Sequence, residues 1–271
     1  MSLASREALA SARERLDALA DNTAVDAAKL AEELAAVTAL LDREVSLRRV
    51  LTDPAQSGEA KAELARRLLG GQVGEESVEL IGGMVRSRWS RSRDLVDAIE
   101  ELASGADLIA AERAGDLDDV EDEVFRFGRI VASNPELRAA LADKVADRRA
   151  KAELVRELLG GRANPVTERL VLRLVTAPRG RSLDGGLNAL SKLAADRRNR
   201  MVAEVTSAVP LSDQQKQRLG EALATLYGRR VHLNLDVDPE IIGGIQVRIG
   251  DEVVNGTIAD RLAEASRRMA G

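Results

Sequence analysis

Few residues of this 271-residue chain could perform chemistry, and none stands in a catalytic pattern. The one histidine, His232, falls on the polar phase of an expected strand, and no neighbouring motif supplies the base or nucleophile that a catalytic histidine needs. The chain has no cysteine, so thiolate nucleophiles and cysteine metal sites are excluded. We therefore expect no catalytic residue and no activity of the chain's own as an enzyme.

The carboxylates and glycines also lack the spacing of a ligand site. The stretch DLDDVEDE at 116–123 has no glycine and no calcium-loop spacing, and acids at the start of a helix stabilise its dipole instead. Five glycine pairs occur, and none extends into G-x-G-x-x-G or G-x-x-x-x-G-K, the loops that cradle phosphates. The sequence thus predicts neither a metal nor a cofactor.

The stretch RSRWSRSR at 86–93 is the strongest candidate for binding an anion. Four arginines around one tryptophan could hold RNA or an acidic protein surface. The same residues also suit the end of a helix, where cations are favourable. The chain has a net charge of −5, which favours the second interpretation and argues against nucleic acid as a general partner.

An internal repeat indicates the structural units on which the candidate residues lie. Fourteen of the 25 positions in 47–71 are identical to 137–161, and the offset of 90 also aligns Arg91-Ser92 with Arg181-Ser182. Apolar residues spaced four and three apart predict amphipathic helices in each copy, with helices near 76–88 and 94–103 closing the first. We read two tandem homologous helical bundles, 1–105 and 106–196.

After Met201 the apolar period becomes two, which predicts strands at 231–237, 245–249 and 252–254. Ser212 and Gln215 form a capping box that opens a helix before the second strand. The order is strand, helix, strand, strand, strand, helix. The fold class is therefore mainly α, with a small α+β domain at 197–271 after the two bundles.

The stretch LNLDVDPEIIGGIQVRIGDEVVNGTIADRLAEASRRM at 233–269 resembles the C-terminal segment of the delta subunit of F-type ATP synthases, whose mitochondrial counterpart is the oligomycin-sensitivity-conferring protein. The likeness covers most of 106–271. The additional bundle, 1–105, resembles the long actinobacterial form of the family and predicts a tandem duplication of its helical domain.

The resemblance implies a non-catalytic stator in the peripheral stalk, present in one copy per complex. The helical domain would receive N-terminal helices of alpha subunits, and the C-terminal domain would hold the b stalk against rotor torque. The expected location is the cytoplasmic face of the cell membrane, reached only through the complex. We place the partner-binding residues near the turn before the third strand and beyond it: Ile242, Gly243, Gly244, Arg248 and Arg261.

Two questions stay open at the level of sequence. Which bundle meets which helix is undetermined, and the additional bundle could hold a second alpha-subunit helix or a longer stalk. A different class of function is a free cytosolic helical adaptor or RNA-associated protein that uses the 86–93 stretch. An RNA binder would lose affinity steeply as salt rises, whereas a stator would sediment with membranes.

Overall fold

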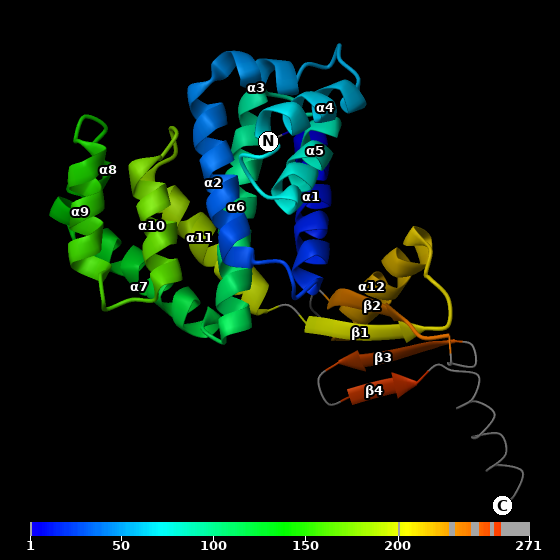
Figure 1. Ribbon diagram of the computed structural model, residues 1–271. Helices are drawn as coiled ribbons and strands as arrows, with labels where there is room; N and C mark the ends of the chain where they lie inside the picture. Colours follow the sequence, from blue (N-terminus) through cyan, green and yellow to red (C-terminus); the bar gives the residue numbers. More distant parts are fainter. Residues whose placement is uncertain (1, 200, 228–230, 240–243, 250–251, 256–271) are drawn as a thin grey trace, which may run out of the picture. The chain divides into compact units, whose positions relative to one another are not determined.

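The computed structural model describes residues 2–199, 201–227, 231–239, 244–249 and 252–255. The chain separates into two compact units, residues 1–195 and 196–271. The first unit is helical, and the second holds the sheet (Figure 1). The predicted fold class, helical bundles followed by a small α+β domain, is confirmed.

The helices of the first unit follow the 90-residue repeat. Helices α2, α4 and α5 begin and end 90 positions before α7, α9 and α10, so the two copies fold alike. The first copy contains α1 (Leu3–Asp21), α2 (Ala27–Arg43), α3 (Val45–Leu51), α4 (Gly58–Leu69) and α5 (Glu75–Arg86). The second contains α7 (Leu117–Ser133), α8 (Pro135–Ala142), α9 (Arg148–Leu159), α10 (Pro165–Thr176) and α11 (Leu183–Arg198).

Helix α6 (Ser92–Ala114) belongs to both copies. It packs on α1, α2 and α5 as the last helix of the first copy, and on α7 and α10 as the counterpart of α1 in the second. The expectation that a helix near 94–103 ends the first bundle is wrong in length, because this helix continues to Ala114. The predicted domain boundary at 105 and 106 falls inside α6, and the division into three domains stays a prediction.

Local sequence explains where the helices stop. Gly71 and Gly161 follow α4 and α9 with φ of 74° and 68°, a left-handed backbone that glycine adopts without strain. Asn134 accepts a hydrogen bond from the Leu137 amide and starts α8 directly after α7. Glycine after α4 and α9, and the Asn134-Pro135 pair after α7, therefore end these helices.

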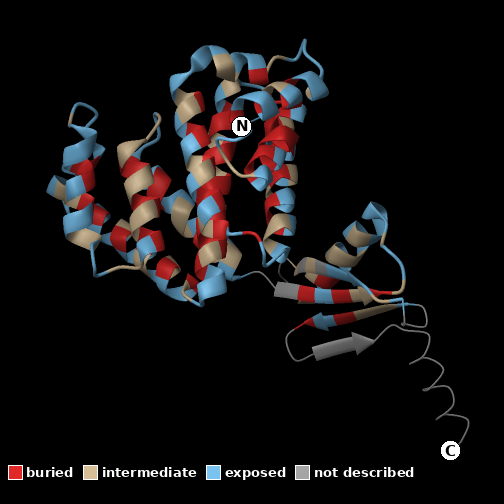
Figure 2. Cartoon of the chain, in the orientation of Figure 1, coloured by how far each residue is buried: buried red, intermediate tan, exposed pale blue. Residues whose placement is uncertain are grey.

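Burial is concentrated around α6 (Figure 2). The first copy has one continuous core, in which Leu95, Ile99 and Leu102 of α6 meet α1, α2 and α5. The core of the second copy consists of two smaller clusters, one around Phe127 and Val171 and one around Val120 and Leu170. The first copy is thus the more thoroughly packed of the two.

The second unit is an α+β fold with the sheet order β2-β1-β3-β4. Its elements are β1 (Met201–Ser207), α12 (Asp213–Tyr227), β2 (Val231–Val237), β3 (Ile245–Ile249) and β4 (Glu252–Asn255). Strands β1 and β2 are parallel and are joined through α12, whereas β3 pairs antiparallel with β1 and β4. Leu223 of α12 packs on Val205 and Val247 of the sheet.

The capping box that was predicted for α12 is present. The Ser212 amide donates to Gln215 Oε1 at 2.8 Å, and the Gln215 amide donates to Ser212 Oγ at 3.3 Å. The predicted order of strand, helix and three strands is confirmed as far as β4. The final helix and the turn at 250–251 lie outside the described residues.

Candidate functional site

Two of the five predicted partner-binding residues lie within the described residues, and each has a local structural role. Gly244 precedes β3 with φ of 91°, a conformation that strongly favours glycine. Arg248 lies opposite Glu204 on the exposed face of the sheet, with its Nε 3.5 Å from Glu204 Oε2. Ile242, Gly243 and Arg261 lie outside the described residues, so their binding role stays a prediction.

Most residues of the 86–93 stretch, apart from Arg88, make contacts within the first unit. Trp89 is buried, and its indole Nε1 donates to the carbonyl of Met84 at 2.8 Å. Arg86 pairs with Glu59 at 2.9 Å, an interaction that holds the pKa of the Glu59 carboxyl below its usual value. A buried indole cannot stack on a base, so the structure favours the helix-end interpretation over RNA binding.

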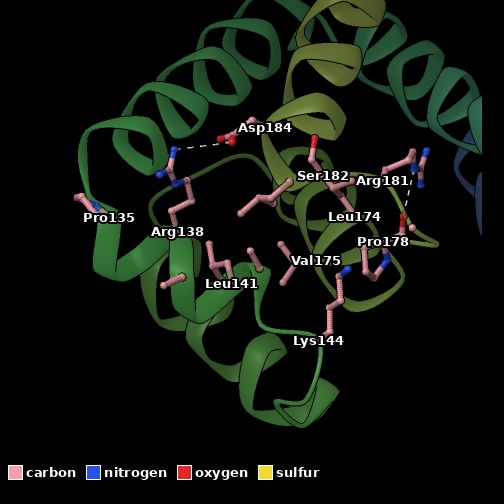
Figure 3. Close-up of a pocket in the computed structure, with 14 residues that line it drawn as sticks. Pro135, Arg138, Leu141, Lys144, Leu174, Val175, Pro178, Arg181, Ser182 and Asp184 are labelled. Carbon is pink, nitrogen blue, oxygen red and sulfur yellow. Dashed lines mark hydrogen bonds and ion pairs between the residues drawn. The ribbon is translucent and has the colours of Figure 1, made fainter.

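A groove opens in the second copy, between α8, the end of α10 and the start of α11 (Figure 3). Its volume is about 620 Å³. Leu141, Leu174 and Val175 provide apolar lining, and Arg138 and Lys144 stand at its edge. Its composition, apolar with cations at the margin, suits an amphipathic helix with acidic flanks.

The first copy has a different hollow in the related position. This notch has a volume of about 820 Å³ and is lined by Ala4, Glu7, Ala8, Ser11, Thr52, Pro54, Lys61, Ser87, Arg88, Trp89 and Ser90. Thr52, Pro54, Arg88 and Ser90 are offset by 90 from residues that line the groove of the second copy. Seven of the eleven residues that line the notch have polar side chains, against five of the fourteen that line the groove, so the two surfaces differ in composition.

Buried ion pairs join the two copies through α6. Asp107 is fully buried and accepts hydrogen bonds from Arg169 at 3.0 Å and Arg173 at 2.8 Å, both on α10. Glu100 lies between Arg179 and Arg181, where burial lowers the pKa of Arg179 and the Glu100 carboxylate opposes that effect. These paired charges fix the second copy against α6.

Further bonds tie α6 to the loop that follows α1. Arg113 of α6 donates to the carbonyls of Ala20, Asn22 and Val25. The residues that line the grooves, and this junction, could not be predicted from the sequence, because neither hydrophobic period nor motif spacing reveals which helix is shared. Lys61 and Lys151 lie at matching positions of the repeated dodecamer, and the structure buries both.

The described part of the chain offers neither a metal site nor a membrane span. Among the described residues, no group of three or more histidine, aspartate or glutamate side chains is placed to hold a metal ion. No helix in those ranges has the length and apolar character needed to cross a bilayer.

Comparison with known proteins identifies the group to which these features belong. The pattern of the family described as ATP synthase delta (OSCP) subunit matches residues 105–269. ATP synthase subunit delta of Streptomyces griseus is 75% identical over 271 residues, covering 100% of each chain. The proteins of that name from Acidothermus cellulolyticus and Thermobifida fusca are 50% and 48% identical, each covering 98% of both chains. The chain therefore belongs to the ATP synthase delta (OSCP) subunit family.

Proposed function

We propose how this chain performs the task of its family. It is a non-catalytic peripheral-stalk subunit of the F-type ATP synthase, which links the N-terminal region of the alpha subunits to the b stalk and resists rotor torque. Torque can change the conformation of the catalytic subunits only if the head is held still. The chain meets this requirement with packed helices and buried ion pairs, and it needs no active site of its own.

The groove of the second copy is the site that we assign to an alpha-subunit helix. The family pattern begins at residue 105, inside α6, and so covers the second copy and leaves most of the first outside. The apolar lining around Leu141 and Leu174 would take the apolar face of a short amphipathic helix, and Arg138 and Lys144 would meet acids beside it. This assignment gives the contact typical of the family to α8, α10 and α11.

The second unit is the part that we assign to the b stalk, around Gly244 and Arg248 and the neighbouring predicted residues. The positive φ of Gly244 at the start of β3 and the ion pair of Arg248 with Glu204 support this assignment to an exposed face of the sheet. As part of the peripheral stalk the chain is held in the complex. We place it on the cytoplasmic face of the cell membrane, which it reaches through its partners.

A pair of variants on one helix tests the groove. Ala139 and Ala140 are both exposed on α8, but only Ala139 lines the groove. Ala139→Trp should fill the groove and weaken binding to delta-depleted catalytic heads by about tenfold or more, as loss of an interface hot spot does. Ala140→Trp should leave the affinity within about twofold. Equal affinities for both variants, measured by calorimetry, would remove the groove from the interface.

A further inference from the structure

The notch of the first copy is lined by a lysine whose side chain is largely buried and has no hydrogen bond or ion pair within the described part of the chain. Lys61 is only 4% exposed and lines the notch. Within the described ranges the structure gives its ammonium group no hydrogen bond and no ion pair. Burial lowers the pKa of Lys61, and the charge of Asp53 opposes this effect. A buried ammonium group is costly unless an anion compensates it.

The corresponding corner of the second copy contains ion pairs that the described residues of the first copy do not form. There Arg179 meets Asp97 and Glu100, two carboxylates of α6. The corresponding corner of the first copy has Trp89 in place of Arg179 and Ala10 in place of Glu100. The first copy thus has neither the arginine nor the carboxylate at position 100, whereas Glu7 stands in place of Asp97 and the lysine is retained in both copies.

The remaining lining indicates the size and character of an occupant. Arg88 adds a second cation to the lining of the notch, which contains the carboxylate of Glu7 and lies within reach of the charge of Asp53. Ala4, Ala8 and Pro54 add apolar surface beside these charges. About 820 Å³ is far more than one small anion fills, and it suits a polypeptide segment that carries an acid next to apolar residues.

We propose that the notch of the first copy binds an acidic side chain of a partner polypeptide, whose carboxylate pairs with Lys61 and Arg88. The two copies then hold their partners differently, the second through an apolar groove and the first through a charge-assisted contact. This inference rests on the proposed stator role, in which the partner is another subunit of the synthase. It gives the additional copy a binding task of its own.

The test uses the full chain and two matched lysines. Lys61→Met removes the ammonium group and keeps an apolar stem, and Lys151→Met makes the same change at a buried position that does not line the groove of its copy. Binding to delta-depleted heads and to purified b stalk is measured separately for each variant. We expect Lys61→Met to weaken one of these interactions by about tenfold or more, and Lys151→Met to leave both within about twofold.

Further measurements separate the possible failures. Circular dichroism and thermal unfolding confirm that both variants fold. The salt dependence of the affected interaction should be shallower in Lys61→Met than in the unchanged chain, because one charge pair has gone. If the unchanged chain binds and Lys61→Met binds equally well, this inference fails and the stator role stands. If the unchanged chain binds neither partner, the stator role itself fails.

One more measurement addresses a free anion. Inorganic phosphate is titrated against the chain, with methyl-labelled lysines observed by NMR. The proposal expects no saturable shift of Lys61 at millimolar phosphate. Saturable phosphate binding at Lys61, together with unchanged partner affinity in Lys61→Met, would identify a small-anion site and overturn the proposal.

Discussion

At the scale of single residues, buried charges decide how the helices are held. Asp107 of α6 is fully buried, and its carboxylate accepts hydrogen bonds from two arginines of α10. Removing one partner of such a group leaves the others uncompensated, which costs more than the pair contributes. Surface pairs such as Arg138 and Asp184, 3.9 Å apart and half exposed, contribute little.

Asp107→Asn should lower the free energy of unfolding of the first unit by about 3 kcal/mol, because Arg169 and Arg173 lose their counter-charge. Urea unfolding followed by circular dichroism measures the change. Asp184→Asn is the control and should change stability by less than about 0.5 kcal/mol. Similar losses in the two variants would contradict the role of Asp107.

Lys61 should give stability a distinctive dependence on pH. Burial lowers the pKa of Lys61 in the folded state, so the unfolded chain binds a proton at Lys61 more tightly than the folded chain does. A fall in pH therefore stabilises the unfolded chain relative to the folded one. The folded state therefore becomes more stable as pH rises through the window between the lowered pKa and the usual value near 10.5. Thermal unfolding between neutral and alkaline pH should show this component in the unchanged chain and not in Lys61→Met.

At the scale of elements, α6 is the helix on which the two copies depend. It contributes Val96, Ile99 and Leu102 to the core of the first copy, and Leu108 and Ala111 to that of the second. A cut at residue 105 would divide α6. Removal of residues 2–91 would leave α6 whole and would expose the apolar face of α6 that packs on the first copy.

A truncated chain without residues 2–91 should therefore aggregate, because the exposed face forms a contiguous apolar patch. The same truncation with Val96→Lys, Ile99→Glu and Leu102→Lys should be soluble and helical, since α6 then presents a polar face. A truncation of 2–105 should lose cooperative unfolding, because half of α6 is gone. Size-exclusion chromatography and thermal unfolding distinguish these outcomes, and equal behaviour of all three would show that α6 is not shared.

Much of this arrangement could be predicted from the sequence, because the signals for single helices and strands are local. The 90-residue offset, the left-handed glycines after α4 and α9 and the alternation in β2 and β3 are local signals. The length of α6 was missed because Gly105 looks like a stop. The structure explains that glycine by close packing, since a Cβ there would lie 3.0 Å from Leu16 Cδ2. The grooves depend on which helices meet, and no local pattern contains that information.

At the scale of the whole molecule, the chain is a connector whose task is mechanical. Adding it to membranes stripped of it should restore ATP-driven proton pumping, because the head is again held against the rotor. ATP hydrolysis by detached heads should be unchanged, since the chain contributes no catalytic group. Fluorescence quenching measures pumping, and phosphate release measures hydrolysis. Pumping that recovers without the chain would contradict its role as a stator.

Because the two copies share α6, the duplication could in principle be extended by further copies. Each added copy brings five new helices and borrows its first from the copy before it, as links do in a chain. Helix α11 is the counterpart of α6, so a third copy grafted after it would find its opening helix in place. The length of such a connector could then be set in steps of 90 residues, with the same kind of joint at every step.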